Sequence, residues 1–296
     1  MNTFFTTLLY LTMEFTTWMI VYTPNAARVA NYNHMNRYIR TNLFVAVDSV
    51  TNFKKTSDFA IENKYSTPGY VNSIKSSPGK LGCNLSHQLL LEEIAKNSPT
   101  DWNLVLEDDT DIFTPLFLKD INYVLRGAES CASKYIQLYT HPRFVEPQRK
   151  YNRIGDNLYN MMRQWGTCAY FIHKDGIPII KSKYPFERNI DFIYSSLLNE
   201  LRSLCWLSPC VRTLGAVDSC DKSSTLGSIC DNNYLIRTVN RAAFDDWGEH
   251  CFYEKYIPNK TAEEVAAIKL AREVIDELID TICGSDCAEN VLAEFD

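Results

Sequence analysis

Residues 104–111 read Leu104-Val-Leu-Glu107-Asp108-Asp109-Thr-Asp111, three apolar residues followed by four carboxylates within five positions. The apolar run is typical of a buried strand. A strand that ends in clustered carboxylates carries them to the carboxyl edge of its sheet, where open α/β sheets bind ligands. Carboxylates this close repel one another, and a hard divalent cation such as Mg²⁺ or Mn²⁺ would neutralise them. An acidic, solvated loop after the strand is the simpler alternative.

The composition is that of an ordinary globular protein. Of the 296 residues, 46% are hydrophobic and 22% are charged. A chain of this length can bury one large core or two modest ones. The formal net charge of −6 argues against a nucleic-acid partner, because nucleic-acid binding requires a basic face.

The chain has 10 cysteines, but their spacing does not indicate a metal site. No two of them form a Cys-x-x-Cys pair, and zinc ligands are usually more tightly paired than these. We therefore expect scattered buried thiols. Disulfide pairing stays open, since it depends on whether the protein enters an oxidising compartment.

Residues 1–14 are predicted to be an appended segment outside the fold. No basic residue precedes the apolar stretch from Phe4 to Tyr22, so the positive region of a signal peptide is missing. As a membrane span the stretch is marginal in length and too polar, and it contains Glu14. We expect Trp18-Met-Ile-Val-Tyr22 to be the first buried strand. A membrane anchor is the less favoured alternative.

The middle of the chain alternates expected strands and helices, which predicts an α/β sheet with much parallel pairing. A polar stretch from Ser49 to Lys80 interrupts this alternation, with expected turns at Pro68-Gly69 and Pro78-Gly79. The expected elements are a helix over 31–39, a strand over 43–47, a helix over 85–96, the strand over 104–107, and strands over 135–139 and 168–172.

Residues 231–296 are predicted to form a C-terminal helical extension. Thr261-Ala-Glu-Glu264 is a capping box. One apolar stripe follows it and Gly284 suits the helix end, so a long amphipathic helix is expected. It would pack on the preceding domain or, less favoured, mediate oligomerisation.

Two motifs carry a resemblance to a known family. Gly82-Cys83-Asn-Leu-Ser86-His87 is followed about twenty residues later by Leu104-Val-Leu-Glu107-Asp108-Asp109. The pair resembles glycosyltransferase family 25, the group that holds lipopolysaccharide and procollagen galactosyltransferases. The likeness extends from about Thr17 to Ile229, with weaker matches at Val47-Asp48, Gly166-Thr167, Asn189-Ile190-Asp191 and Ser223-Ser224-Thr225.

This resemblance implies a GT-A fold, which is the fold of the nucleotide-diphospho-sugar transferases. Residues 15–230 would form a Rossmann-like mixed α/β sheet flanked by helices. The implied donor is a nucleotide diphosphate sugar, UDP-linked, that carries a hexose such as galactose. The implied acceptor is a glycan or a glycoprotein hydroxyl. Mn²⁺ or Mg²⁺ held by carboxylates would compensate the charge of the departing diphosphate.

The resemblance also implies roles for the acidic residues. Asp109 is expected to bind the metal, with Glu107 and Asp111 as further ligands. Glu107 or Asp108 would contact the metal or the ribose. Asp48 is expected to hydrogen-bond the ribose or the base.

The Gly-Cys-x-x-Ser-His motif is expected to open a helix. Gly82, Ser86 and His87 would then lie where backbone amides and the helix dipole attract the donor phosphates. A purely structural role for His87 is the alternative, and Cys83 is expected to pack beneath the site.

Family members of this group resemble inverting enzymes, which need a carboxylate base on the acceptor side. Asp191 precedes an apolar, helix-like run and is the expected base. The alternative is that Asp191 is a helix N-cap, a position that Asp fills well. Glu187 and Asp175 are the less favoured substitutes for the base.

The sequence departs from the family pattern in two places. Thr23-Pro-Asn-Ala-Ala-Arg28 stands where an Asp-Arg opening is usual, and Lys80 replaces the usual acidic residue before Gly-Cys. These departures bear on the identity of the donor more than on the fold. The glycosylation sequon at Asn84 lies inside the proposed site, which favours a cytoplasmic setting over the secretory lumen.

Two other function classes are weighed against the transferase. A GT-A-like module could bind the nucleotide sugar through the same metal site without turnover. Asp109-Thr-Asp111 also resembles the Asp-x-Asp of dehalogenase-type phosphatases, but Ile112-Phe113 follow where a small residue is expected. A metal-dependent phosphatase is therefore discounted.

Overall fold

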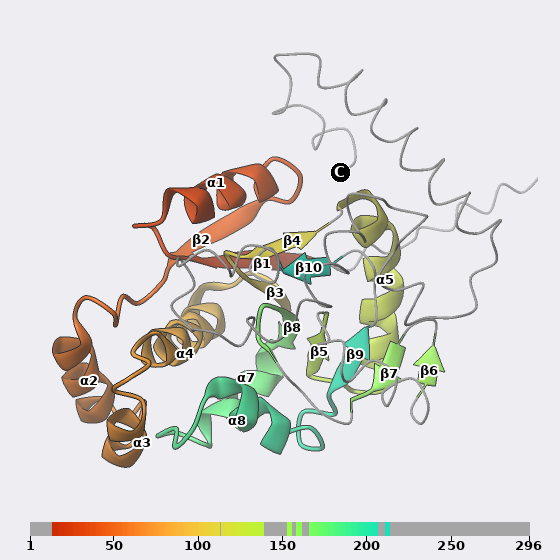
Figure 1. The fold of residues 1–296 in the computed structure, drawn as a ribbon. Helices are drawn as coiled ribbons and strands as arrows, with labels where there is room; N and C mark the ends of the chain where they lie inside the picture. The colour runs from red at the N-terminus through yellow and green to blue at the C-terminus, as the bar shows by residue number, and fades with distance from the viewer. Residues whose placement is uncertain are drawn as a thin grey trace, which may run out of the picture.

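The computed structural model describes residues 14–112, 114–138, 153–155, 158–161, 166–206 and 211–213. Strands and helices alternate through most of this part of the chain (Figure 1). The strands are β1 (Phe15–Val21), β2 (Thr41–Val45), β3 (Trp102–Glu107), β4 (Thr110–Ile112), β5 (Tyr135–Gln137), β6 (Arg153–Gly155), β7 (Leu158–Asn160), β8 (Ala169–His173), β9 (Leu204–Trp206) and β10 (Val211–Thr213). The helices are α1 (Ala26–Met35), α2 (Phe53–Glu62), α3 (Pro68–Ser73), α4 (Gly79–Asn97), α5 (Thr114–Ser130), α7 (Ile177–Lys181) and α8 (Ile190–Ser196), with a short 3₁₀ turn, η2 (Lys174–Gly176), before α7.

Eight of the strands form one mixed sheet in the order β2-β1-β3-β8-β5-β9-β7-β6, and β4 pairs with β10. Strand β1 runs parallel to β2 and β3. Strand β8 runs antiparallel to β3 and β5. The predicted class, a mixed α/β sheet flanked by helices, is confirmed. The predicted parallel pairing holds for β2-β1-β3, where the carboxylate-tipped strand lies.

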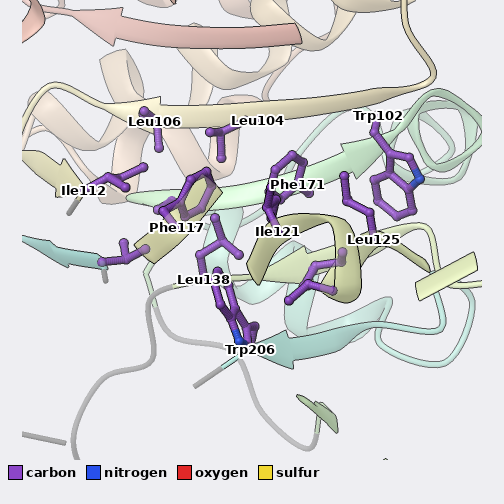
Figure 2. Close-up of a cluster of buried hydrophobic side chains, with 14 of the residues drawn as sticks. Trp102, Leu104, Leu106, Ile112, Phe117, Ile121, Leu125, Leu138, Phe171 and Trp206 are labelled. Carbon is purple, nitrogen blue, oxygen red and sulfur yellow. The ribbon is translucent and has the colours of Figure 1, made fainter. Parts of the chain in front are cut away.

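Helices cover both faces of the sheet, so the central strands β1, β3 and β8 bury side chains in two directions (Figure 1). Alternate residues of β3 point to opposite faces, as strand geometry requires. Val105 packs with α4, α7 and α8 on one face. The opposite face packs against α5 (Figure 2). There, side chains of β3 (Trp102, Leu104 and Leu106) lie in one cluster with Phe117, Ile121 and Leu125 of that helix.

The polar stretch from Ser49 to Lys80, in which the sequence predicts turns at Pro68-Gly69 and Pro78-Gly79, contains helices α2 and α3. Pro68 occupies the first turn of α3 rather than a reverse turn, and the Thr67 side chain caps the helix by accepting from the Tyr70 N–H at 3.3 Å. These helices bury only a narrow apolar face against the start of α4. Their remaining surface is polar, in agreement with the composition of this stretch.

Two predicted segments lie outside the described residues. They are most of the N-terminal appendage, residues 1–13, and the C-terminal extension of residues 231–296 with its amphipathic helix. The first strand begins at Phe15, three residues before the predicted Trp18. Among the described residues, none of the helices has the length and apolar character needed to cross a membrane.

Candidate functional site

The carboxyl ends of β1, β2 and β3 meet at one edge of the sheet, because the three strands run parallel. A cavity of about 120 Å³, partly open to solvent, lies at this edge. Its walls come from the ends of these strands, from the loop after β2, and from α1 and α4. The lining residues are Ile20, Tyr22, Asn25, Arg28, Ala46, Val47, Asp48, Ser49, Val50, Gly79, Gly82, Cys83, Ser86, His87, Glu107, Asp108 and Asp109. Every predicted site residue is among them except Asp111 and Asp191.

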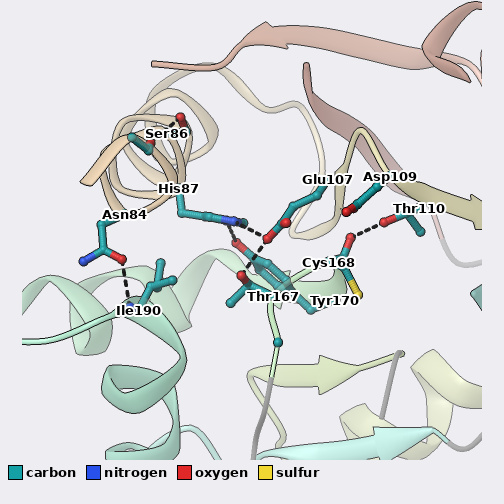
Figure 3. A network of polar contacts seen from close by, with 12 residues as sticks. Asn84, Ser86, His87, Glu107, Asp109, Thr110, Thr167, Cys168, Tyr170 and Ile190 are labelled. Carbon is teal, nitrogen blue, oxygen red and sulfur yellow. Dashed lines mark hydrogen bonds and ion pairs between the residues drawn. The ribbon is translucent and has the colours of Figure 1, made fainter. Parts of the chain in front are cut away.

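Glu107, the last residue of β3, points inward to a buried polar network (Figure 3). Its Oε1 accepts hydrogen bonds from Thr167 Oγ1 at 2.7 Å and pairs with His87 Nε2 at 3.1 Å. Burial opposes ionisation of Glu107, but the contacts with His87 and Thr167 outweigh it and hold the pKa of Glu107 below its ordinary value. Glu107 is therefore an anion fixed in place by its neighbours.

His87 is 1% exposed, and both of its ring nitrogens have partners. Nδ1 lies 2.9 Å from the Tyr170 hydroxyl, which in turn lies 3.3 Å from the hydroxyl of Tyr194 in α8. This chain of contacts joins the tip of β3 to the helix that carries Asp191. His87 thus holds Glu107 in orientation, in agreement with the structural alternative for this residue.

The Gly-Cys-x-x-Ser-His motif does not open a helix, so that prediction is wrong. Helix α4 begins at Gly79, and Ser86 and His87 lie in its third turn, away from the free amides of its first turn. Ser86 Oγ donates to the Gly82 carbonyl at 2.7 Å and accepts from the Val47 N–H at 2.8 Å. Ser86 thereby ties α4 to the end of β2. The prediction failed because Pro78-Gly79 is typical of a turn, whereas Gly79 is the first residue of α4.

Gly82 lies where α4 crosses the loop after β2. A Cβ at this position would come within 2.5 Å of the Val47 carbonyl oxygen and 2.6 Å of Ser49 Oγ. The first contact is with backbone, so relief requires α4 or the loop to move. Gly82 is therefore the residue that permits the close approach of these two walls of the cavity.

We expect Gly82→Ala to destabilise the protein by roughly 1–3 kcal/mol, the usual cost of overpacking. Gly69→Ala is the matched control, because Gly69 is also helical and its Cβ would meet nothing within 4 Å. The control should be neutral or stabilising by up to about 1 kcal/mol. Urea unfolding of both variants measures the difference. Equal free energies of unfolding would contradict the assigned contact.

Asp48 shapes the loop after β2. Its Oδ1 accepts from the backbone N–H groups of Val50 at 3.0 Å and Thr51 at 3.1 Å. The hydrogen bond from the Thr51 hydroxyl is the main cause that holds the pKa of Asp48 below its ordinary value. Asp48 is thus an ionised residue at the rim of the cavity, across from the tip of β3.

Asp108 and Asp109 follow β3 and share one cation. Arg28 Nη1, from α1, lies 3.3 Å from Asp108 Oδ1 and 3.4 Å from Asp109 Oδ2. Asp108 Oδ2 also accepts from the Tyr22 N–H at 2.7 Å. Asp109 Oδ1 is buried and has no hydrogen-bond partner among the described residues. Burial first, and then the nearby charge of Glu107, raise the pKa of Asp109 to about 7 against the opposing effect of Arg28.

The turn that presents these carboxylates is held from two sides. Asn31 Nδ2 donates to the carbonyls of Asp108 at 3.0 Å and Thr110 at 2.8 Å. Thr110 Oγ1 donates to the Cys168 carbonyl at 2.6 Å (Figure 3). The backbone of Asp111 lies in β4, opposite Arg212 of β10. The predicted role of the Asp111 side chain falls outside the described part of the structure.

Asp191 is the second residue of α8, and Asn189 rather than Asp191 occupies the N-cap position. Hydrogen bonds from the Gly166 N–H and the Thr167 hydroxyl favour the Asp191 carboxylate. Burial outweighs them and, with the charge of Glu107, raises the pKa of Asp191 to about 6. Thr167 therefore contacts both Glu107 and Asp191. The N-cap alternative for Asp191 does not agree with this placement.

Buried polar contacts fix the start of α8 against α4. Asn84 Oδ1 accepts from the Ile190 N–H at 2.9 Å, and Asn84 Nδ2 donates to the Arg188 carbonyl at 3.1 Å. The Tyr70 hydroxyl donates to Asn189 Oδ1 at 2.8 Å. Asn84 is 1% exposed, so its amide is committed to positioning the helix that carries Asp191.

The two substitutes for the base lie elsewhere. Asp175 follows β8, and the last residue of β8, His173, pairs with Trp102 at the amino end of β3. Asp175 therefore lies toward the opposite end of the strands from the cavity. It is 68% exposed and lies 2.9 Å from Lys134 Nζ. Glu187 is also exposed. Neither residue has the buried setting that raises the pKa of Asp191.

The model of glycosyltransferase family 25 (LPS biosynthesis protein) matches residues 29–193, more than half of the chain. The chain belongs to glycosyltransferase family 25. The resemblance predicted from the two motifs is confirmed, and the protein is a glycosyltransferase of the nucleotide-diphospho-sugar transferase fold class. No curated protein matches the sequence.

Solved structures show distant likenesses. UDP-glucose pyrophosphorylase complexed with UDP-glucose has 12% identity and a TM-score of 0.36, covering 66% of this chain and 90% of that one. Protein A197 from STIV has 14% identity and a TM-score of 0.35, covering 66% of this chain and 82% of that one.

Within this family 25 protein, the main residue that sequence reasoning missed is Arg28. The sequence marked it only as part of an unusual opening after the first strand. Nothing in its local pattern indicates that α1 carries its guanidinium to the tip of β3, 80 residues later in the chain. Thr167 was recognised as part of a weak family match, but its bridging of two carboxylates was not.

A second group of metal-binding side chains lies near the first. Ligand atoms of Cys83, His87 and Glu107 all lie within 4.8 Å of one another. Burial raises the pKa of the Cys83 thiol, so the sulfur is protonated at neutral pH and is a poor ligand. His87 and Glu107 already bond each other. Asp109, with its unpartnered oxygen, is the better metal ligand.

Proposed function

We propose that this family 25 protein is a metal-dependent, inverting glycosyltransferase. It would move a hexose, galactose by family resemblance, from a UDP-linked donor to a hydroxyl of a glycan or glycoprotein. The cavity at the carboxyl edge of β1, β2 and β3 would hold the donor, as such edges do in α/β proteins. A cytoplasmic setting is part of the proposal, because a glycan could not be attached to the buried Asn84.

The observation that carries the proposal is the unpartnered Oδ1 of Asp109. A buried carboxylate oxygen without a hydrogen bond is costly unless something else binds it. Three carboxylates gather here, and among the described side chains Arg28 is the one guanidinium that pairs with them, so this part of the cluster still lacks positive charge. Hard oxygen donors of this kind suit Mn²⁺ or Mg²⁺. Asp109 and Asp108 would hold the ion, and Glu107 would support the site from its fixed position.

A bound divalent cation would compensate the charge of the diphosphate as it leaves the sugar. The protein's own residues would do the rest. Asp48, which lines the cavity, would accept a hydrogen bond from the nucleoside. The unusual opening of residues 23–28 forms part of the same wall through Asn25 and Arg28.

Proton removal from the acceptor would fall to Asp191. A general base works best when its pKa lies near the operating pH, and burial raises the pKa of Asp191 to about 6. The Gly166 N–H and the Thr167 hydroxyl orient the carboxylate. Asp191 lies outside the lining of the donor cavity, and direct attack by an acceptor hydroxyl that it deprotonates would invert the configuration at the sugar carbon.

The experiment that tests the function is a screen of nucleotide sugars with the purified protein. We expect release of nucleoside diphosphate from one donor class, UDP-hexoses, in the presence of Mn²⁺, and loss of that release in EDTA. Binding of UDP with Mn²⁺ but no hydrolysis or transfer with any donor would favour the non-catalytic binding module. Release that persists unchanged in EDTA would overturn the metal dependence.

A further inference from the structure

Arg28 contacts the two carboxylates that are proposed to hold the metal ion. It lies in the first turn of α1, whose cap Asn25 accepts from the N–H groups of Ala27 and Arg28 at 3.0 Å and 3.3 Å. From there a single nitrogen, Nη1, reaches both Asp108 Oδ1 and Asp109 Oδ2. The Arg28 side chain is 17% exposed and lines the cavity. It is therefore an internal cation at the edge of a ligand site.

The contacts of Arg28 with the two carboxylates are longer than the usual charge-assisted hydrogen bond. Both nitrogen–oxygen distances exceed 3.2 Å, whereas charge-assisted hydrogen bonds are usually shorter. Asp108 and Asp109 expose 15% and 25% of their side chains, so the pair is open to exchange from the cavity. Asp108 keeps a second partner in the Tyr22 N–H, which holds its carboxylate in place when Arg28 leaves.

We propose that Arg28 is an exchangeable counter-ion, an inference that rests on the proposed function. In the metal-free protein it neutralises Asp108 and Asp109. With a divalent cation bound at these carboxylates, the Arg28 guanidinium would turn into the cavity and bind the diphosphate of the donor. Arg28 thus competes with the metal and assists the nucleotide. Metal and nucleotide binding are thereby coupled, because metal binding releases Arg28 for the nucleotide and nucleotide binding withdraws Arg28 from the metal-binding carboxylates.

The coupling predicts effects of opposite sign for one substitution. Arg28→Gln removes the competing cation, so the affinity for Mn²⁺ alone should rise by about fivefold or more. The same variant loses a diphosphate ligand, so the affinity for UDP at saturating Mn²⁺ should fall by roughly tenfold or more. Isothermal titration calorimetry measures both constants. Arg37→Gln is the matched control, since it removes the same charge from an exposed position just after α1 and should change neither constant.

A second variant, Arg28→Lys, distinguishes the loss of a specific contact from misfolding of Arg28→Gln. Arg28→Lys keeps the positive charge but loses the planar fork, so Mn²⁺ affinity should stay near that of the natural protein and UDP affinity should fall. Weakening of both ligands in Arg28→Gln would overturn the proposal, because a purely structural arginine behaves in that way. Unchanged constants in both variants would also overturn it while leaving the proposed function intact. Failure of the natural protein to bind Mn²⁺ would overturn both.

Discussion

Asp109→Asn is expected to abolish most of the Mn²⁺-dependent binding of UDP while leaving the protein folded. The substitution keeps the size of the side chain and one carbonyl oxygen but removes the negative charge that a divalent cation requires. Asp109 has a carboxylate oxygen without a hydrogen-bond partner. Removal of the Asp109 charge should therefore lower the metal affinity more than removal of the Asp108 charge does. Calorimetry of UDP with Mn²⁺, and of Mn²⁺ alone, measures both effects.

The matched control for this variant is Asp101→Asn. Asp101 precedes the same strand at its amino end, is exposed, and undergoes the same chemical change. It should bind Mn²⁺ and UDP as the natural protein does. If Asp109→Asn retains Mn²⁺-dependent UDP binding, the metal is held elsewhere, and the group formed by Cys83, His87 and Glu107 becomes the next candidate.

Thermal stability gives a second readout for Asp109→Asn. The pKa of Asp109 is about 7 in the folded protein, above its ordinary value of about 4. Ionisation of this group therefore lowers the stability of the folded protein as pH rises from about 4 to above 7. In EDTA the variant should therefore melt at a higher temperature than the natural protein at pH 8, with the difference shrinking toward pH 4. Added Mn²⁺ should raise the melting temperature of the natural protein only.

The central strand and its carboxylates could be predicted because the information is local. Apolar residues 104–106 and the acidic residues after them lie next to each other in the sequence, and one strand presents them all. The adjacent parallel strands were also readable as short apolar runs. The place of β8, inserted antiparallel between β3 and β5, could not be read from the sequence, because strand order depends on contacts between distant segments.

The start of α4 shows how a local rule misleads. Apolar residues at helical spacing begin at Leu85 and Pro78-Gly79 is typical of a turn, so the predicted helix began at Leu85, whereas α4 begins at Gly79, a weak helix former. In the fold Gly82 is needed for close approach to Val47, and packing of Leu81 and Leu85 outweighs the poor propensity. The consequence was functional as well as structural, since it placed Ser86 and His87 at a phosphate-binding helix start that does not exist.

The prediction for the base concerns chemistry rather than donor binding. Asp191→Asn preserves the size of the side chain but cannot accept a proton at neutral pH. We expect transfer to fall by roughly 10²–10⁴-fold, the usual contribution of a general base. The affinity for UDP and Mn²⁺ should be nearly unchanged, because Asp191 does not line the donor cavity. Single-turnover transfer and calorimetry on the same preparation separate the two effects.

Glu187→Gln is the matched control for the base, because Glu187 is a nearby but exposed carboxylate. This variant should transfer at the normal rate. The reverse pattern, with normal transfer in Asp191→Asn and a large loss in Glu187→Gln, would reassign the base. Loss of transfer in both variants would indicate that the acceptor loop as a whole, rather than one carboxylate, sets the rate.

The pH dependence tests whether Asp191 acts as the base in its ionised form. Its pKa of about 6 predicts that transfer by the natural protein rises with pH through that value and then levels off, whereas Asp191→Asn shows no such rise. Stability should follow the opposite course. Because burial raises the pKa of Asp191 in the folded protein, its ionisation costs stability as pH rises from about 4 to above 6. Asp191→Asn should therefore be at least as stable as the natural protein at pH 8. A helix N-cap would instead lose about 1 kcal/mol on substitution and leave transfer intact.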